Sequence, residues 1–361
     1  MTPLPPGSTI GIVGGGQLGR MLAMAAARLG YRTIILEPQP DCPALQVATR
    51  QIEAAYDDEA GLDELAAACA VVTYEFENVP VVVAARLGRS VAVFPPPKAL
   101  EIAQDRVVEK TFLNSIGVET ARFMAIDTLA GLGDALASFG GVGLLKTRRL
   151  GYDGKGQAPI RAPEAAETAF HGLGGRDLIL EALVPFEREI SVVAARGRDG
   201  RLAAFDPAEN VHRDGILRSS SVPARIAAET AAAARAAAFQ ILEALDYVGV
   251  IGVELFVLAD GSLLANEIAP RVHNSGHWTE AACAVSQFEQ HIRAVAGLPL
   301  GDPAHHADCV MENLIGADIG RLAALAAEAG VFIHHYGKTE TRPGRKMGHF
   351  TRLRPLQAPS P

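Results

Sequence analysis

Long hydrophobic runs and excess positive charge are both missing from this sequence. No apolar stretch approaches the roughly 18 residues of a membrane-spanning helix, and the chain does not open with a basic, apolar leader. Acidic side chains outnumber basic ones among the 361 residues, and the net charge of −8 argues against nucleic acid as a partner. We therefore expect a soluble, cytoplasmic protein that binds neither membranes nor nucleic acid.

Cysteine and lysine are both scarce. The four cysteines lie far apart and form no C-x-x-C pair, which favours reduced thiols over a disulfide framework or a metal site. Only six of the 33 basic residues are lysine. A chain that mostly uses arginine is expected to keep lysine where a compact, flexible ammonium group is needed. Four of the six, Lys146, Lys155, Lys338 and Lys346, fall inside the second glycine-rich stretch and the tail stretch described below.

The first hundred residues alternate between strand and helix patterns. We expect strands at 8–14 and 31–37, a helix between them that Gly30 ends, and a further strand within 70–80. This alternation predicts an α/β domain built from βαβ units. The triple proline at 95–97 can continue neither a helix nor a central strand, so it marks a linker.

The rest of the chain has a different texture, typical of an α+β architecture. A helix at 105–117 leads into a β-rich region, and an alanine-rich helix spans about 227–245. A long hairpin follows at 249–270, with its turn at Asp260-Gly261. Earlier strands are expected at 143–147, 177–183 and 189–197.

A glycine motif lies in the stretch GIVGGGQLGR, residues 11–20. Gly14, Gly16 and Gly19 stand in G-x-G-x-x-G register between a predicted strand and a predicted helix, and Glu37 ends the next strand. This is nearly the whole fingerprint of a nicotinamide or flavin dinucleotide site. An NAD-dependent oxidoreductase is therefore one hypothesis, but it gives no role to the lysines, paired carboxylates and cationic tail described next.

A second glycine-rich stretch, LLKTRRLGYDGKGQ, occupies residues 144–157. Lys146 belongs to a predicted strand and directs an ammonium group to one face. The three glycines that follow let backbone N–H groups approach a phosphate closely, and Lys155 adds positive charge. A flexible hairpin turn is the alternative, and the spacing is not that of a P-loop.

Two carboxylates occupy the arms of the long hairpin. Glu254 lies six residues before Asp260 and Glu267 six residues after Gly261, so an antiparallel pair places them roughly opposite one another. Two neighbouring carboxylates repel each other, and a divalent cation such as Mg²⁺ relieves that repulsion. Asn266 can add a carbonyl ligand. The alternative is that one of the two acids faces solvent.

The stretch ILEALVPFEREIS supplies Glu181, the apolar Leu183-Val184 step and Glu189. A strand edge that offers backbone groups, followed by an acid, suits an adenine amino group and ribose hydroxyls. The alternative is a surface acid at a strand end.

Hydrogen-bond donors crowd into the stretch APRVHNSGHWT, directly after the second acidic strand. A loop this rich in donors is unfavourable to bury unless it meets a ligand. A zinc site is the rival interpretation, but no third ligand at metal spacing is evident in the sequence. The donors are Arg271, His273, Asn274, Ser275, His277 and Trp278.

The tail stretch YGKTETRPGRKMGH carries a cluster of cationic side chains with two glycines, which suits a phosphate monoester. The alternative is a solvated basic tail. The members of the cluster are Lys338, Arg342, Arg345, Lys346 and His349.

In this order, the motifs resemble the ATP-grasp superfamily of carboxylate-amine ligases. Within it the chain is similar to the N5-carboxyaminoimidazole ribonucleotide synthase family, the ATPase subunit of phosphoribosylaminoimidazole carboxylase. The similarity runs from residue 10 to about 350, and HNSGHWT and GRKMGH are far more specific than the glycine fingerprint. Val272 is one departure, since family members often have proline there; it should alter loop stiffness and not chemistry. The remaining motifs are GIVGGGQLGRM, TYEFENVP, QDRVVEK, GYDGKGQ, EREISVV, ENVHRDGILR and NEIAPRVHNSGHWT.

The resemblance implies a fold of three domains. These are a Rossmann-like domain of the biotin-carboxylase type at 1–104, an ATP-grasp domain at 105–298 and a small β-rich domain at 299–361. It also implies that the N-terminal fold is kept without NAD or FAD, and that its glycine loop borders a ribonucleotide pocket. A homodimer and functional coupling to the mutase that consumes the product are further implications.

The implied reaction converts 5-aminoimidazole ribonucleotide, ATP and bicarbonate into N5-carboxyaminoimidazole ribonucleotide, ADP and phosphate, a step of purine biosynthesis. ATP would convert bicarbonate to carboxyphosphate, and the exocyclic amine would capture the carboxyl group. An ATP-grasp enzyme that activates formate for glycinamide ribonucleotide is the nearest alternative.

The resemblance also assigns roles to residues. It gives Mg²⁺, bound with ATP, the ligands Glu254 and Glu267, and it places Arg271, His273, Asn274 and Lys146 at the reacting groups. The residues implied to bind ATP are Arg106, Lys146, Gly151, Tyr152, Asp153, Gly154, Lys155, Gly156, Gln157, Glu181, Ala182, Leu183, Val184, Glu189, His212, Asn266 and Glu267. Those implied to bind the ribonucleotide are Gly16, Gln17, Leu18, Glu75, Arg271, Asn274, Ser275, Lys338, Arg345 and Lys346.

Overall fold

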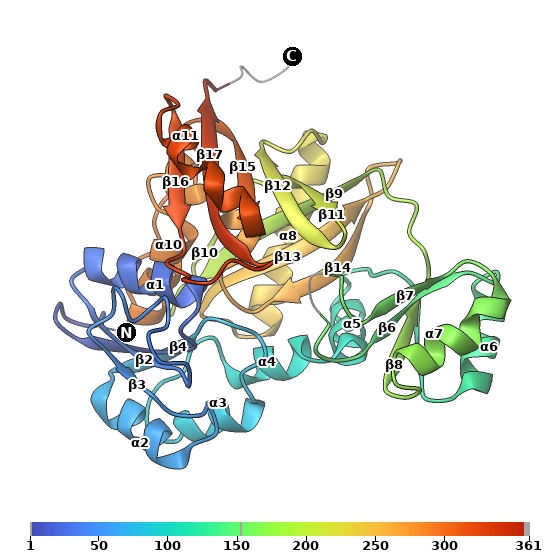
Figure 1. Ribbon diagram of the computed structural model, residues 1–361, viewed down its shortest axis with the longest axis horizontal. Coiled ribbons are helices and arrows are strands. Elements are labelled where there is room, and N and C mark those ends of the chain that lie inside the picture. The colour runs from blue at the N-terminus through green and yellow to red at the C-terminus, as the bar shows by residue number, and fades with distance from the viewer. Residues whose placement is uncertain (1, 152–153, 357–361) are drawn as a thin grey trace.

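Three sheets make up the architecture of this chain. The computed structural model describes residues 2–151 and 154–356, and within these ranges the sheets have four, nine and four strands. In Figure 1 the N-terminal sheet, in blue, and a small sheet, in green, lie on opposite sides of the large sheet. None of the described helices is long and apolar enough to cross a membrane.

The N-terminal sheet is parallel, as the βαβ pattern predicts. Strands β1 and β4 are almost entirely apolar and buried, which is typical of a parallel sheet covered on both faces. Its strands in spatial order are β3 (Arg50–Ile52), β2 (Arg32–Leu36), β1 (Thr9–Val13) and β4 (Val71–Tyr74). Its helices are α1 (Gln17–Arg28), α2 (Glu59–Ala68) and α3 (Val81–Leu87).

Two short helices lead from this domain to the next. Pro97, the last residue of the triple proline, is the first residue of α4 (Pro97–Ala103), a position where proline is tolerated because its missing N–H has no partner in any case. Asp105 then caps α5 (Arg106–Ser115), accepting hydrogen bonds from the N–H groups of Val107 and Val108. The linker predicted at the prolines is thus short and leads directly into helix.

The small sheet is antiparallel and carries its own core, in which Leu136, Leu145 and Phe170 are buried. Its strands in spatial order are β5 (Phe123–Ile126), β8 (Leu178–Glu181), β6 (Gly143–Thr147) and β7 (Gln157–Ile160). It packs with α6 (Leu129–Ser138), η1 (Pro163–Ala165) and α7 (Ala166–Gly172).

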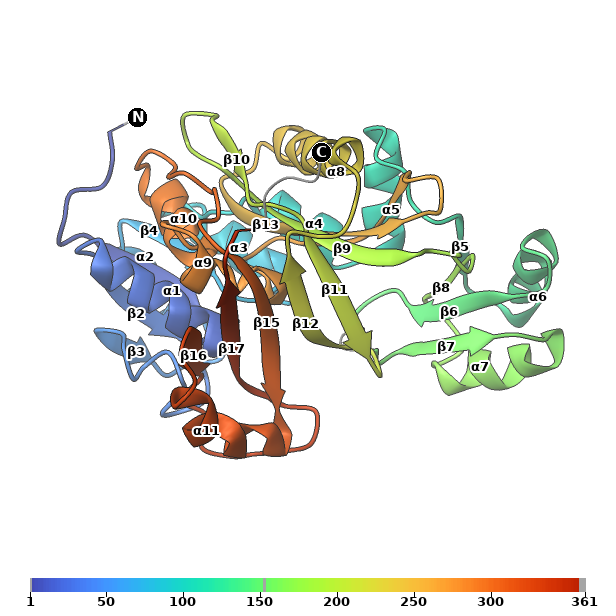
Figure 2. The same cartoon turned by 90° about the horizontal axis from the view of Figure 1, so that it is seen from above.

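The large sheet joins the centre of the chain to its C-terminal part. The C-terminal strands do not form a sheet of their own, because β12 pairs antiparallel with β15, and the two lie side by side in Figure 2. The spatial order is β14 (Leu263–Ala269), β13 (Gly249–Val257), β9 (Arg188–Arg196), β11 (Ala208–Arg213), β12 (Ile216–Val222), β15 (Asp308–Ile315), β17 (Lys346–Arg354) and β16 (Val331–His335), with β10 (Leu202–Ala204) beside β9. The accompanying helices are α8 (Ala228–Ala244), η2 (Asn274–Gly276), α9 (Thr279–Ala282), α10 (Gln287–Ala296), η3 (Gly316–Arg321) and α11 (Leu322–Ala326).

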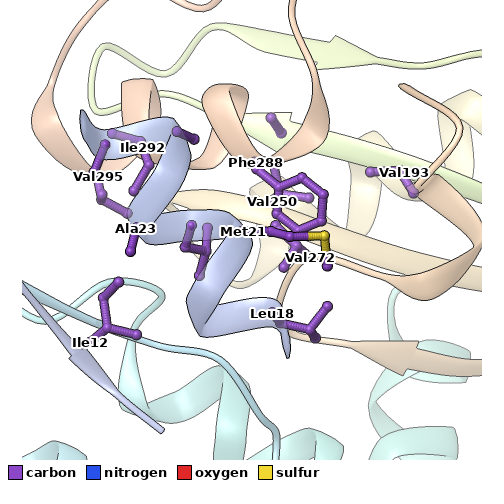
Figure 3. Close-up of a cluster of buried hydrophobic side chains, with 14 of the residues drawn as sticks. Ile12, Leu18, Met21, Ala23, Val193, Val250, Val272, Phe288, Ile292 and Val295 are labelled. Carbon is purple, nitrogen blue, oxygen red and sulfur yellow. The ribbon is translucent and has the colours of Figure 1, made fainter. Parts of the chain in front are cut away.

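A shared apolar core fixes the N-terminal domain against the large sheet (Figure 3). Met21 of α1 and Phe288 and Ile292 of α10 belong to one buried cluster, together with Val250 of β13. Full burial of each such side chain stabilises the fold by about 1.5–3 kcal/mol. The two parts therefore hold a fixed geometry, and side chains from both can contribute to one site.

Candidate functional site

A cavity of about 620 Å³ lies where the three sheets meet. Each part of the chain contributes to its wall: Glu75 from the N-terminal domain, Lys146 from the small sheet, Glu267 from the large sheet and Lys346 from the C-terminal strands. A concave space of this size, with convergent polar groups, is the usual form of a small-molecule site.

One wall of the cavity carries a buried cluster of cations. The ammonium of Lys146, on β6, donates to the Glu181 carboxylate at 2.9 Å. Lys110, on α5, lies 3.6 Å from the same carboxylate and donates to the Asn266 carbonyl at 3.0 Å. Burial would raise the pKa of Glu181, but the two lysines lower it below its ordinary value. The side chain of Glu181 thus positions both ammonium groups. Its backbone is the part of the residue suited to hydrogen-bonding with adenine.

The segment that follows Glu181 leads to Phe186, one of two stacked phenylalanines in the cavity wall. The Ala182 N–H donates to the Arg122 carbonyl, and Leu183, which follows, is 46 % exposed. Further along, Phe186 lines the cavity and stacks on Phe256, with ring centroids 4.6 Å apart and planes at 15°. The sequence pattern did not predict this aromatic pair.

The two hairpin carboxylates also line the cavity. Glu254 and Glu267 are register partners on β13 and β14, which confirms the spacing argument from the turn. Burial, and then the neighbouring Glu267, raise the pKa of Glu254 to about 7. Arg106 donates to Glu267 at 3.1 Å, and the Asn266 amide lies 3.5 Å from Glu254. Two neighbouring carboxylates, whose oxygens are the ligands that Mg²⁺ prefers, fit a divalent cation of this kind.

A second ion pair lies beside this carboxylate pair. His212 Nδ1 is 2.6 Å from a Glu189 oxygen. Burial lowers the pKa of His212, but the Glu189 hydrogen bond and nearby carboxylates raise it above its ordinary value. Both side chains line the cavity, so the predicted ribose acid is engaged by histidine.

The glycine loop after β6 borders the cavity beside Lys146. Gly151, Gly154, Lys155 and Gln157 line it, and Arg106 donates to the Gly151 carbonyl at 3.4 Å. Gly154 has a φ of +75°, a conformation that strongly favours glycine. Tyr152 and Asp153, also predicted to bind ATP, lie outside the described residues.

The N-terminal glycine loop is closed by the chain's own carboxylates. The N–H groups of Gly16 and Gly19 both donate to Glu75, the latter at 2.6 Å. The Gly15 N–H donates to Glu37 at 2.8 Å. In a dinucleotide site these donors would meet the pyrophosphate. Here an internal acid occupies the anion position, while Gln17 and Leu18 line the cavity next to it.

The donor-rich loop after β14 is buried against the cavity. Burial opposes the ionisation of Glu77, but Arg271, which pairs with it, lowers the pKa of Glu77 to about 2. Burial and then Arg271 lower the pKa of His273 to about 3, so its imidazole is neutral. His273 Nδ1 lies 2.8 Å from the Ser275 hydroxyl. Among the described residues, the Asn274 amide finds no partner although it lines the cavity, so it is available to a ligand.

Only part of the predicted cationic tail faces the cavity. Lys346 lines it, beside Tyr336. The Lys338 ammonium donates to the Lys346 carbonyl at 2.8 Å, and Arg345 donates to the Glu340 carbonyl at 2.9 Å. The structure thus brings Lys346 into the site, whereas Lys338 contacts its backbone and Arg345 contacts the Glu340 backbone, and neither is among the residues that line the cavity.

Several residues of the site were not identified from the sequence. Lys110 is buried at the junction of three elements, and the rarity of lysine was the available signal. Glu109, its neighbour, accepts a hydrogen bond from the Ile268 N–H at 2.6 Å and fixes β14 against α5. Burial and Glu267 raise the pKa of Glu109 to about 8. Tyr336 and Glu77 lie inside motifs quoted above, but nothing in those motifs distinguished their side chains.

This architecture is that of an ATP-grasp ligase. Residues 111–288 match the family model described as an ATP-grasp domain. Residues 8–104 match a ribonucleotide synthetase preATP-grasp domain, and residues 309–358 match a phosphoribosylaminoimidazole carboxylase C-terminal domain.

The similarity to particular proteins extends over nearly the whole chain. The N5-carboxyaminoimidazole ribonucleotide synthase of Brucella melitensis is 63% identical over 356 residues, 98% of each chain. The solved synthetase from Thermus thermophilus is 48% identical with a TM-score of 0.90, covering 96% of this chain and 93% of that one. The Aspergillus clavatus synthase, solved with ADP and 5-aminoimidazole ribonucleotide, is 30% identical with a TM-score of 0.91, covering 97% and 94%. This chain belongs to the N5-carboxyaminoimidazole ribonucleotide synthase family.

Proposed function

We propose that the cavity is the site in which this ligase carboxylates 5-aminoimidazole ribonucleotide to N5-carboxyaminoimidazole ribonucleotide, with bicarbonate as the carboxyl source. ATP-dependent carboxylation in purine biosynthesis is the activity of the family. The arrangement of cations, carboxylates and donors around one cavity supports the assignment of each reactant to a wall.

ATP occupies the side of the cavity between the small sheet and the hairpin. Its phosphates meet Lys146, Arg106 and the glycine loop at 151–157, where positive charge and backbone donors converge. The adenine follows the backbone of Glu181 to Val184, and the ribose faces Glu189 and His212. The adenine lies near Phe186, whose ring belongs to the wall.

Glu254 and Glu267 hold Mg²⁺ with the ATP phosphates, and Asn266 lies beside them. The pair fits a cation because burial, and then the charge of Glu267, raise the pKa of Glu254, and a metal ion would compensate both effects. When bound, the ion neutralises charge on the phosphates and draws them into position for transfer. His273, 3.5 Å from Glu254, is neutral and does not compete for the carboxylate.

The chemistry proceeds in two transfers. A bicarbonate oxygen attacks the γ-phosphorus of ATP, the bond to the β-phosphate bridging oxygen breaks, and ADP leaves with carboxyphosphate formed. The exocyclic amine of the ribonucleotide then attacks the carboxyl carbon, or CO₂ released from it in place, and phosphate leaves as the amine loses a proton. Arg271, His273 and Asn274 surround the meeting point, and Lys146 and Arg106 neutralise charge on the transferred phosphoryl group.

The ribonucleotide occupies the remaining side, between the N-terminal loop and the C-terminal strands. Its 5′-phosphate meets Lys346, with Lys338 and Arg345 behind it, because the N-terminal glycine loop is already filled by Glu75. Gln17, Leu18 and Glu75 border the ribose, and Ser275 supports the loop that carries Asn274.

The observation that carries this assignment is the Asn274 amide, which has no partner among the described residues and lies in the wall of the cavity that the carboxylate pair and Lys146 also line. The test is ADP release from Mg·ATP in bicarbonate buffer, with and without the ribonucleotide. Strong stimulation by the ribonucleotide, lost in bicarbonate-depleted buffer, is expected. No stimulation would contradict the substrate assignment, and glycinamide ribonucleotide with formate would then be the next pair to assay.

We further propose that the protein acts in the cytoplasm as a homodimer and passes its product to the mutase that consumes it. Family membership supports these three points. Sedimentation equilibrium at micromolar concentration tests the dimer. A coupled assay with the mutase and a trap for free product tests the transfer, because direct transfer makes the trap ineffective.

A further inference from the structure

A cluster of metal-type ligands lies outside the carboxylation site, at the junction of the C-terminal strands and the loop after η2. His334 of β16 and His349 of β17 are register partners on adjacent antiparallel strands, so their side chains share one face of the sheet. Their rings stack, with centroids 5.3 Å apart and planes at 17°. Glu280 of α9 reaches this pair from a different segment of the chain.

The ligand atoms of these three residues converge. The Glu280 carboxylate oxygen lies 3.1 Å from His334 Nδ1 and 3.7 Å from His349 Nε2. All three atoms lie within 4.8 Å of one another. Small adjustments of the side chains would bring all three to the roughly 2.0–2.2 Å at which imidazole nitrogen and carboxylate oxygen bind Zn²⁺.

The surroundings support a bound ion. The second nitrogen of His349, Nδ1, lies 2.9 Å from the Tyr336 hydroxyl, which fixes the ring and leaves Nε2 directed at Glu280. Such a hydrogen bond from the far nitrogen is the usual support of a metal-bound histidine. Glu280 is exposed while His349 is buried, so an ion can enter from solvent and then lose most of its water.

We propose that Glu280, His334 and His349 form a binding site for a transition-metal ion of the Zn²⁺ type, separate from the Mg²⁺ site. Two imidazoles and one carboxylate favour such an ion over Mg²⁺, which prefers oxygen ligands alone. Three protein ligands leave a position for water.

The ion would tie the β16–β17 hairpin to α9. Tyr336 and His277, which flank the two segments, both line the carboxylation cavity. His277 also lies against His349, with ring centroids 4.7 Å apart. A bound ion would thus stabilise the part of the cavity wall that we assign to the ribonucleotide. The ion itself would not contact the ribonucleotide.

The test is Zn²⁺ binding to the purified, metal-stripped protein by competition with a chromogenic chelator, in excess Mg²⁺ and ADP so that the carboxylate pair at 254 and 267 is occupied. We expect one equivalent to bind, with the affinity lowered about tenfold or more in His334→Ala and in Glu280→Gln. His335→Ala is the matched control, because His335 is the exposed neighbour on the same strand. It should bind Zn²⁺ as the unmodified protein does.

Two further readouts keep the outcome decisive. Zn²⁺ should raise the thermal midpoint of the unmodified protein and of His335→Ala, but not that of His334→Ala. Co²⁺ should produce visible absorption bands that disappear in Glu280→Gln and His334→Ala. Unchanged affinity in these two variants, or an equal loss in the His335→Ala control, would show that Zn²⁺ binds elsewhere and would overturn the proposal.

Discussion

Two glycine-rich loops of this molecule have similar composition and opposite surroundings. The loop at 14–19 directs the N–H groups of Gly16 and Gly19 at Glu75, so its anion position is filled from within the chain. The loop after β6 instead lies beside Lys146 and Arg106 and borders the cavity. The charge of the neighbouring side chains, and not the glycine spacing, decides whether such a loop can receive a phosphate.

The comparison also explains how a Rossmann-like domain serves a ligase. A glycine loop whose N–H donors are satisfied internally supports the cavity wall, to which Gln17 and Leu18 contribute. In the assignment proposed above, the phosphates are instead bound by lysines and arginines on the other parts of the chain. The four predictions that follow test the two loops and their partners, from the largest expected effect to the smallest.

The largest effect is expected at the carboxylate pair that we propose to hold Mg²⁺, which Arg106 links to the loop after β6. Glu267→Gln removes one of the two paired carboxylates and weakens the ion pair with Arg106, so turnover of Mg·ATP should fall about 10³-fold or more. The measurement is the steady-state rate of ADP release with the ribonucleotide at saturation. Glu243→Gln, an exposed site on α8, is the control. Near-normal turnover in Glu267→Gln would remove the metal assignment.

A second prediction concerns where the ribonucleotide phosphate binds, given that the N-terminal loop is closed. Lys346→Ala should raise KM for the ribonucleotide about 10- to 100-fold, because it removes a charged contact, and leave KM for ATP within about twofold. Lys98→Ala, exposed on α4, is the control and should change neither constant. Equal losses for both substrates would mean that Lys346 does not act on the ribonucleotide phosphate.

The third prediction concerns the loop at 14–19, whose N–H groups are bound by Glu75. Glu75→Ala leaves the N–H groups of Gly16 and Gly19 without their acceptor, and should lower the free energy of unfolding by about 2 kcal/mol or more. Sulfate should then stabilise the variant more than the unmodified protein, since the vacated donors form an anion site. Thermal unfolding with and without sulfate measures both effects, with Glu53→Ala as an exposed control. Equal sulfate stabilisation in all three proteins would show that the loop was never closed to anions.

Local patterns in the sequence were sufficient for the βαβ order of the first domain, for the long hairpin and for one pair of site residues. The opposition of Glu254 and Glu267 follows from counting outward from the turn at Asp260-Gly261, because hairpin register is set by its turn. The pairing of Glu75 with the glycine loop, 56 and 59 positions away, was not predictable in this way. It depends on the parallel order of β1 and β4, which places the ends of the two strands together.

Contacts across greater separations were missed for the same reason. Lys110 meets Glu181 and the Asn266 carbonyl, which lie on two different sheets, and no spacing rule links these positions. The pairing of β12 with β15, which merges the C-terminal strands into the large sheet, likewise joins segments separated by a long stretch of chain. The resemblance to a family supplied site residues that periodicity could not.

The smallest effect is expected in the stability of the metal-free cavity. The pKa of Glu254 is about 7 in the folded protein against an ordinary value of 4.5, so the folded state holds this proton more tightly than the unfolded chain. The group therefore opposes folding increasingly as pH rises from about 4.5 through 7, and most at pH 8. Glu254→Gln should raise the thermal midpoint in EDTA by a few degrees at pH 8 and much less at pH 5, while abolishing turnover. An equal midpoint shift at both pH values would mean that neither burial nor Glu267 destabilises the Glu254 carboxylate. The carboxylate pair, like the closed loop at 14–19, would then have its charges balanced before any ligand arrives.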